Sequence, residues 1–362
     1  MKILLVITSL GMGGAERQVC DLADQFTALG HQIILISMTG ETVNLPRSTM
    51  VKVVSLNMTK KPLGFVRAYW QARKLIEQFE PDVVHSHMVH ANLFVRLLRL
   101  SVHFPKLICT AHNTYEGSRI RMLAYRVTDR LCDLSTNVSQ EAVDAFIQQG
   151  AVPVGRMLAM HNGIDTARFT FDEMSRVRLR TELGLNDDTL LLLAVGRLNV
   201  QKDYPNLFSA FSKLVGNYKN LQLAIIGVGE EEDKLVSMVT KLELNERVIF
   251  LGLRRDVNDW MSAADLFVLS SAWEGFGLVV AEAMACERVV VATDCGGVKE
   301  VIGNSGILVP AKNSAALEIA ISQALSMKSI VAKRLGLQAR EFVIKNYSLD
   351  AVATKWIDLY KQ

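Results

Sequence analysis

Residues 2–18 read KILLVITSLGMGGAERQ, an apolar run that ends in closely spaced glycines and continues into an amphipathic stretch. This order is typical of a parallel strand, a tight turn and a helix. A second such start, TLLLLAVGRL, lies at residues 189–198, and apolar runs alternate with amphipathic stretches around both. The alternation predicts βαβ units, so we expect an α/β protein with two doubly wound, Rossmann-like parallel sheets.

The domain boundary is expected where this rhythm breaks, just after Asp165. A length of 362 residues also fits about two domains. We predict an N-terminal domain over residues 1–165, a C-terminal domain over 166–347 and a last helix over 348–362 that packs across the domain junction. The carboxyl ends of the two sheets, where open α/β sheets bind ligands, should then face one central cleft.

Composition narrows the class of protein. Half of the residues are apolar and 21% are charged, which indicates an ordered globular chain. The five cysteines form no CxxC pair, which argues against a disulfide framework or a zinc site and fits a reducing cytosol. The first apolar run is too short for a membrane span, so we expect a cytoplasmic, soluble or peripheral protein.

The glycine turn of residues 11–14 allows two interpretations. Gly13 and Gly14 either let the backbone approach a phosphate at a helix N-terminus or only form a tight turn. The spacing is GxGG, and the second strand ends ILISMTG without an acidic residue to hold a ribose. Both features count against a nicotinamide-dependent oxidoreductase, which remains the weaker alternative.

The strongest constellation lies in the second half of the chain. Arg197 and Lys202 follow a strand, and Glu274 and Glu282 stand eight residues apart around the glycine-bounded loop EGFG. A helix that begins near Gly277 would place Glu282 about 7 Å further along its axis, comparable to the length of a pyrophosphate. The two carboxylates could bind the sugar and the ribose of a nucleotide-sugar, and the two cations and the helix N-terminus could bind its diphosphate.

Metal binding is not expected. His85, His87 and His90 lie close in sequence, but histidines without a carboxylate at ligand spacing are usually hydrogen-bonded cleft or core groups. The acidic pair Asp187 and Asp188 precedes a strand and is typical of a turn. We therefore expect no metal and no bound cofactor.

The chain resembles the family 4 retaining glycosyltransferases of the GT-B fold along its whole length. The residues that carry this resemblance are SLGMGGAER, DVVHSHMVHAN, TAHNTY, HNGIDTARF, GRLNVQKDY, IIGVGEEED, FLGLRRDV and, above all, the Glu-x7-Glu motif EGFGLVVAE. The resemblance implies a transferase that uses a nucleotide-sugar as its donor substrate and retains the anomeric configuration. Because no DxD element stands at a strand end, we expect the reaction to need no metal ion.

Residue roles in the C-terminal half follow from the resemblance. It implies that Glu274 contacts the donor sugar, that Glu282 holds the ribose and that Arg197 and Lys202 bind the diphosphate. The backbone around Leu253 is implied to read the base. The loop amides at the helix start are expected to meet the diphosphate as well; they belong to Gly275, Phe276, Gly277 and Leu278.

The N-terminal half is implied to supply the remaining contacts. Gly13 and Gly14 would approach the phosphates, and His112 would lie near the reacting sugar. Overall similarity to bacterial O-antigen and lipopolysaccharide transferases favours a UDP-N-acetylhexosamine, such as UDP-GalNAc or UDP-GlcNAc, and an undecaprenyl-diphosphate-linked saccharide acceptor. The alternative is a non-hydrolysing nucleotide-sugar epimerase, which would consume the UDP-sugar without an acceptor.

Charge is concentrated between residues 60 and 130, with twelve basic and five acidic side chains. We expect Lys60, Lys61, Arg67 and Arg73 to dock on an anionic membrane surface, together with Phe65, Tyr69 and Trp70 and, further along, Arg96 and Arg99. The alternative is that the aromatic rings are buried and the cations are simply solvated. No nucleic-acid partner is expected.

Overall fold

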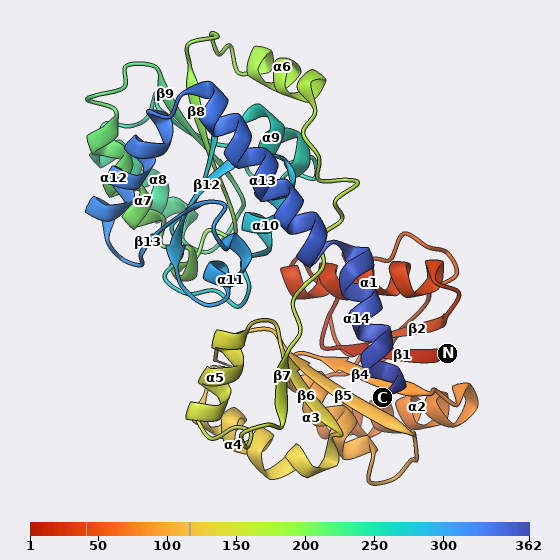
Figure 1. The fold of residues 1–362 in the computed structure, drawn as a ribbon. Helices are drawn as coiled ribbons and strands as arrows, with labels where there is room; N and C mark the ends of the chain where they lie inside the picture. Colours follow the sequence, from red (N-terminus) through yellow and green to blue (C-terminus); the bar gives the residue numbers. More distant parts are fainter. Residues whose placement is uncertain (41, 116) are drawn as a thin grey trace. The chain divides into compact units, whose positions relative to one another are not determined.

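The computed structural model describes residues 1–40, 42–115 and 117–362. The chain divides into two compact units, one formed by Met1–Gly163 with Leu349–Gln362 and the other by Ile164–Ser348 (Figure 1). Each unit holds one parallel sheet with helices around it. The predicted pair of doubly wound α/β domains is therefore confirmed.

The N-terminal unit is built on a sheet of seven strands among its described residues, in the order β3-β2-β1-β4-β5-β6-β7. All neighbouring strands run parallel, and β1 lies between β2 and β4. The strands are β1 (Lys2–Ile7), β2 (Gln32–Ser37), β3 (Lys52–Ser55), β4 (Val83–His87), β5 (Lys106–Ala111), β6 (Leu134–Asn137) and β7 (Met157–Ala159).

Side chains of β1 alternate between the two faces of this sheet. Ile3, Leu5 and Ile7 pack in one cluster with the first and the last helix, whereas Leu4 and Val6 pack in another with α2 (Pro62–Phe79) and α3 (Val89–Leu98). A strand buried on both faces reads as a continuous apolar run, which explains ILLVI. The helices are α1 (Gly14–Ala28), α2 (Pro62–Phe79), α3 (Val89–Leu98), α4 (Arg119–Thr128), α5 (Gln140–Gln148) and α14 (Leu349–Lys361).

The C-terminal segment forms α14 and packs within the N-terminal unit, beside α1 in Figure 1. Trp356 and Tyr360 are buried, and the ring of Tyr360 meets Phe26 of α1 edge to face at 5.6 Å. Aromatic side chains of this size contribute much of the apolar area in a small core. The last helix is therefore part of the first unit's core.

The C-terminal unit repeats the architecture with six strands among its described residues, in the order β10-β9-β8-β11-β12-β13. The strands are β8 (Leu190–Val195), β9 (Leu221–Ile226), β10 (Val248–Phe250), β11 (Leu266–Leu269), β12 (Val289–Asp294) and β13 (Ile307–Pro310). The helices are α6 (Glu173–Glu182), α7 (Tyr204–Leu214), α8 (Glu232–Lys241), α9 (Val257–Ala263), α10 (Leu278–Ala285), α11 (Val298–Ile302), α12 (Ser314–Leu325) and α13 (Ser329–Tyr347).

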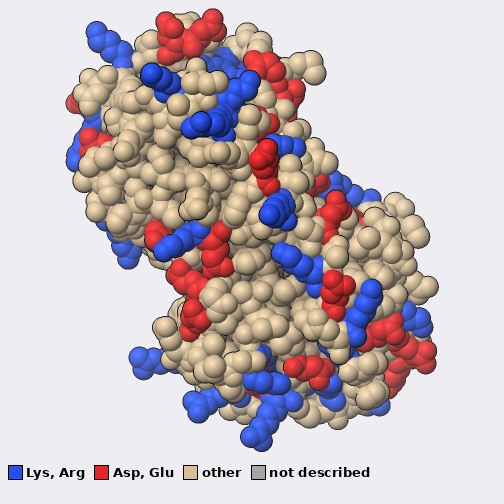
Figure 2. All heavy atoms as spheres, viewed as in Figure 1, with Lys and Arg blue, Asp and Glu red and all other residues tan. Residues whose placement is uncertain are grey.

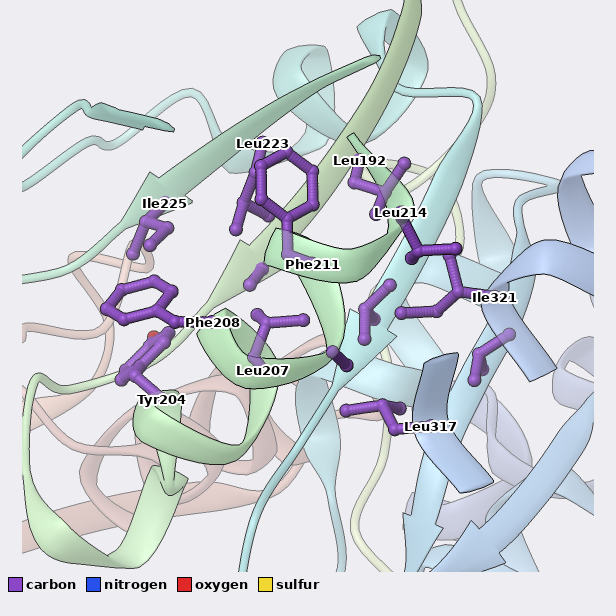
Figure 3. Close-up of a cluster of buried hydrophobic side chains, with 14 of the residues drawn as sticks. Leu192, Tyr204, Leu207, Phe208, Phe211, Leu214, Leu223, Ile225, Leu317 and Ile321 are labelled. Atoms are coloured by element: carbon purple, nitrogen blue, oxygen red, sulfur yellow. The ribbon is translucent and has the colours of Figure 1, made fainter. Parts of the chain in front are cut away.

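One cluster of buried side chains packs β8, β9 and β11 against α7 and α12 (Figure 3). Phe208 and Phe211 of α7 are fully buried in it and lie over Leu223 and Ile225 of β9. Because this core is closely packed, the loops that leave the carboxyl ends of β8 and β11 start from rigid positions.

Over the described residues, no single helix is long and apolar enough to cross a membrane. Within those residues, the pair α12 and α13 passes by length and composition, but the two helices are bent by 109° at their junction.

Candidate functional site

Two neighbouring strands of the C-terminal unit carry the predicted site residues. β11 pairs with β8 in register, so the loops that follow these strands emerge side by side. The first loop holds Arg197 and Lys202, and the second holds Glu274. The two loops are far apart in the sequence but lie together at the carboxyl edge of the sheet, where open α/β sheets bind ligands.

Local structure places the Lys202 ammonium group. Lys202 ends a short 3-10 helix, Val200–Lys202, whose first turn is capped by the side chain of Asn199. Its aliphatic stem crosses Gly196 so closely that a Cβ there would lie 2.7 Å from Cε of Lys202. A glycine at this position therefore gives the lysine its path across the strand end.

The ammonium group of Lys202 meets the carboxylate of Glu274 with an Nζ to Oε1 distance of 2.5 Å. The hydroxyl of Ser271 donates to the same oxygen at 2.7 Å, and the amide of Gln201 donates to Oε2 at 3.3 Å. Lys202 and Glu274 keep only 15% and 8% of their side-chain surface exposed. The pair is thus nearly buried and the carboxylate is held by three donors.

Sequence reasoning missed Ser271 and Gln201. Both donate to the carboxylate of Glu274, and further hydrogen bonds hold their own backbones. The hydroxyl of Thr293 donates to the carbonyl of Ser271, and the backbone amide of Ala272 donates to the carbonyl of Gln201. The only available signal was that each lies within three residues of a predicted charged residue. Serine and glutamine at such positions are too common to stand out.

The loop after Glu274 turns sharply into α10. Gly277 caps the helix with φ of +87°. Gly296 has φ of +55°, and a Cβ on it would lie 1.9 Å from the carbonyl oxygen of Glu274. Only glycine tolerates both the positive φ and the close approach. Glu282 lies on α10 with 5% of its surface exposed, so it is a buried residue and not a solvated surface charge.

The other loop residues contribute differently. Gly275 accepts a backbone hydrogen bond from Gly297 at 3.2 Å, which ties the loop to the turn after β12. The side chain of Phe276 is buried with its ring 5.4 Å from that of Tyr347, so this side chain serves the core. Leu278 is the first residue of α10, where the helix dipole is positive.

Arg197 and Leu253 lie nearer the surface. The Arg197 guanidinium is 3.1 Å from the carboxylate of Glu230, and both side chains are more than half exposed. Such exposed pairs contribute little stability, so the arginine is free to change partner when an anion arrives. Leu253 follows β10 and is 55% exposed.

In the N-terminal unit, Gly13 caps α1 and Gly14 begins it. A Cβ on Gly13 would collide with the carboxylate of Glu16, which folds back over the helix start. Burial raises the pKa of this carboxyl group above its usual range. A carboxylate at a helix N-terminus satisfies the same dipole and amide groups that would attract a phosphate.

His112 follows β5 and is partly buried, with its Nε2 3.2 Å from Nδ1 of His87. Burial lowers the pKa of His112 to about 4 and that of His85 to about 3, which keeps both imidazoles neutral near pH 7. His85 is hydrogen-bonded to Tyr360 and Thr110, as expected for core histidines. His90 is exposed on α3, and the described residues hold no group of three metal-ligating side chains.

Only some of the residues predicted to form the basic surface of the N-terminal unit are exposed. The prediction that Arg96 joins the surface patch was wrong, because Arg96 is fully buried and donates to the carbonyl of Tyr125 and to Ser135. Tyr69 is also partly buried, with its hydroxyl 2.6 Å from that of Ser101. Arg99 forms a bidentate pair with Asp133.

Family models match both halves of the chain. Residues 12–168 match the model described as Glycosyltransferase Family 4, and residues 175–342 match that of Glycosyl transferases group 1. The N-acetyl-alpha-D-glucosaminyl L-malate synthase of Bacillus anthracis is 28% identical over 99% of this chain and 97% of its own length. A relative from Campylobacter jejuni is 25% identical over 86% of this chain and 87% of its own. It is an N-acetylgalactosamine-N,N'-diacetylbacillosaminyl-diphospho-undecaprenol 4-alpha-N-acetylgalactosaminyltransferase.

Solved structures agree with the fold. The crystal structure of Anabaena Alr3699/HepE in complex with UDP covers all of both chains with a TM-score of 0.88 at 23% identity. The sequence motifs, the two parallel-sheet units and the two family models lead to one conclusion. The chain belongs to the family 4 glycosyltransferases of the GT-B fold.

Proposed function

We propose that this glycosyltransferase moves an N-acetylhexosamine from a UDP-sugar to a hydroxyl of a lipid-linked saccharide, with retention of anomeric configuration and without a metal ion. One observation carries the proposal. Glu274, held by Lys202, Ser271 and Gln201, lies directly before the N-terminus of α10, and Glu282 is buried further along that helix.

The arrangement matches the charges of the donor. An immobilised carboxylate can accept hydrogen bonds from sugar hydroxyls, while Lys202 and the start of α10 supply positive potential for the diphosphate. Arg197 can add a second cation, because its present pair with Glu230 is exposed. Preorganised groups that meet developing charge contribute about 3 kcal/mol each to transition-state stabilisation.

The bond changes follow from this placement. The bond between the anomeric carbon and the diphosphate oxygen breaks, and the acceptor oxygen bonds to the anomeric carbon from the same face. The acceptor proton passes to an oxygen of the departing phosphate, which acts as the base. Lys202 and Arg197 stabilise the negative charge that remains on UDP.

Names of the relatives support the donor class. The Bacillus anthracis enzyme is named for an N-acetylglucosaminyl product, and the Campylobacter jejuni enzyme for N-acetylgalactosaminyl transfer to a diphospho-undecaprenol saccharide. The Anabaena protein was crystallised with UDP. A UDP-N-acetylhexosamine and an undecaprenyl-diphosphate-linked acceptor, used in bacterial surface polysaccharide synthesis, are therefore the proposed substrates.

Docking of the N-terminal unit on an anionic membrane is the second part of the proposal, with the inner face of the cytoplasmic membrane as its place. On α2, Leu63, Val66 and Trp70 recur at helical spacing with 84%, 49% and 56% of their surface exposed. Basic side chains flank this stripe, namely those of Lys60, Lys61, Arg67 and Arg73. An apolar stripe bordered by cations suits a lipid interface.

A second helix of the same unit has similar character. On α4, Ile120, Leu123 and Val127 are 79%, 58% and 73% exposed, and Arg119 and Arg121 lie beside them. In Figure 2, Lys and Arg side chains gather at the lower edge of this unit, where Figure 1 draws α4. The surface of α4 therefore supports the same partner as α2.

Transfer is tested by incubating the protein with a panel of UDP-sugars, first alone and then with an undecaprenyl-diphosphate-linked N-acetylhexosamine. We expect a product only when the acceptor is present, with unchanged yield in EDTA and an α-anomeric signal by NMR if the donor is α-linked. Epimerised UDP-sugar in the reaction without acceptor would assign the chain to the epimerases. Loss of activity in EDTA would contradict metal independence.

Membrane docking is tested by liposome flotation. The wild type should float with anionic vesicles at low salt and be released as salt rises. A variant with Lys60, Lys61, Arg67 and Arg73 changed to glutamine should remain in solution. Equal flotation with neutral and anionic vesicles would contradict docking through this surface.

A further inference from the structure

Three histidine rings of the N-terminal unit form a contiguous row. His85 and His87 lie two residues apart on β4, and their ring centroids are 4.0 Å apart. His112, beyond the end of the neighbouring strand β5, has its ring centroid 5.4 Å from that of His87. The row leads from the core of the sheet to the residue implied to lie near the reacting sugar.

The inner end of the row is fixed. Nδ1 of His85 is 2.6 Å from the hydroxyl of Tyr360 on α14, and Nε2 is 2.6 Å from the hydroxyl of Thr110. The ring of Trp356 lies against His85 with a centroid distance of 4.5 Å. Because His85 cannot rotate without losing both hydrogen bonds, the ring of His87 is packed against a fixed surface.

The link between His87 and His112 contains a single proton. Burial lowers the pKa of both imidazoles well below 6.5, and the neighbouring rings of His85 and His112 lower the pKa of His87 further. Both rings are therefore neutral near pH 7, and each carries a proton on one nitrogen only. Either Nδ1 of His87 donates to Nε2 of His112, or the reverse holds.

The second nitrogen of His87 decides between these arrangements. Nε2 of His87 is buried and has no hydrogen-bond partner within the described part of the chain. If His112 donated, the proton of His87 would sit on this nitrogen as a buried, unpaired N–H group. An unpaired donor is rarer in folded proteins than an acceptor with an unused lone pair. His87 therefore donates from Nδ1, and His112 must carry its own proton on Nδ1.

We propose that His87 is a positioning residue that fixes His112 as an Nδ1–H donor toward the donor sugar. This inference rests on the proposed function and on the family resemblance of the sequence, which implies that His112 lies near the reacting sugar. A donor at this position recognises an oxygen with a free lone pair, such as a ring, hydroxyl or carbonyl oxygen of the sugar. His87 itself touches no substrate and acts only through the ring that it orients.

The test compares side chains of one shape and opposite hydrogen-bonding character. In His87→Asn the side-chain amide can donate to Nε2 of His112. In His87→Asp the carboxylate can only accept, so the proton of His112 must lie on Nε2. His87→Leu carries no charge and forms no side-chain hydrogen bond, so it removes the hydrogen-bond partner of His112. His103→Asn, at an exposed position of the same unit, is the matched control.

The first readout is the tautomer of His112, measured by two-bond nitrogen–proton NMR on protein labelled with 15N-histidine and assigned with His112→Gln. We expect Nδ1–H in the wild type, in His103→Asn and in His87→Asn. In His87→Asp and His87→Leu we expect Nε2–H. An Nε2–H wild type, or a tautomer that His87→Leu leaves unchanged, would overturn the proposal.

The second readout is transfer with the best UDP-sugar. Turnover should fall roughly tenfold in His87→Leu, the size of one lost neutral hydrogen bond, and recover largely in His87→Asn. The affinity for UDP, which lacks the sugar, should not change. Unchanged turnover in His87→Leu, or an equal loss of UDP affinity, would overturn the role. A wild type that transfers no sugar would contradict the proposed function. The NMR measurement of the His112 tautomer would then still test whether His87 positions that ring.

Discussion

The Lys202–Glu274 pair offers the sharpest test of the site, by a double-mutant cycle. Lys202→Met keeps the length of the side chain and removes its charge, and Glu274→Gln keeps the shape of the carboxylate. The double variant removes both charges. Since the pair is 15% and 8% exposed, each single variant leaves one charge nearly buried without its partner.

The magnitude follows from this burial. Removing one partner of a buried ion pair destabilises a protein by about 3–5 kcal/mol. Lys202 keeps some exposure and Glu274 keeps its bonds to Ser271 and Gln201, so we expect about 3 kcal/mol for Lys202→Met. In a domain of this size that corresponds to a melting temperature lower by about 6–12 °C. The double variant should lose no more than Lys202→Met alone.

Thermal and urea unfolding of the four proteins give the coupling free energy. Glu230→Gln is the matched control, because it breaks the exposed Arg197–Glu230 pair and should change stability by less than about 1 kcal/mol. A coupling well above about 0.5 kcal/mol is expected for groups in contact. If the two single effects simply add, the two side chains do not interact as argued.

The same variants separate the sugar from the nucleotide. Glu274→Gln removes a negative charge that touches Lys202, so UDP should bind equally well or more tightly. Transfer should nevertheless fall by about a hundredfold or more, because the contact to the sugar is lost. Calorimetry with UDP and a transfer assay measure the two effects. A fall in UDP affinity that equals the fall in turnover would contradict the assignment of Glu274 to the sugar.

Glu282→Gln should weaken UDP binding, and unchanged calorimetric affinity would remove this residue from the ribose. Arg197→Ala should lower turnover by about a hundredfold and Arg197→Lys should restore it only in part, since a lysine lacks the bidentate fork; an effect confined to the acceptor's KM would contradict the role. Trp356→Ala should destabilise the N-terminal unit by about 3–5 kcal/mol in urea unfolding, because the side chain is 2% exposed; a loss below about 1 kcal/mol would contradict its place in the core. Burial lowers the pKa of His85 to about 3, whereas an unfolded histidine binds its proton below about 6.5, so the unfolding free energy should fall as pH drops from about 6.5 toward 4. Melting temperatures at pH 7 and pH 5 check this, and the decline should be weaker in His85→Gln.

The sequence determined the fold class and most strand positions. Strands buried on both faces must be continuous apolar runs, and the connecting helices must be amphipathic, so both signals are local and readable. The apolar runs LLLLAV and LQLAII, for example, form β8 (Leu190–Val195) and β9 (Leu221–Ile226).

The sequence also singled out Lys202, Glu274 and Glu282, because charged residues at strand ends and helix starts indicate ligand contacts. It could not show that Lys202 and Glu274 hold each other, since they stand 72 residues apart and meet only through the pairing of β8 with β11. Ser271 and Gln201 entered the site for the same reason.

Burial of charged and polar residues was decided by the tertiary structure alone. Arg96 has the same local sequence character as a surface cation, yet it is fully buried. The histidine row joins β4, the end of β5 and α14 from distant parts of the chain. Periodicity tells which face of one element is apolar, whereas the partner of a polar side chain depends on which elements the strand order brings together.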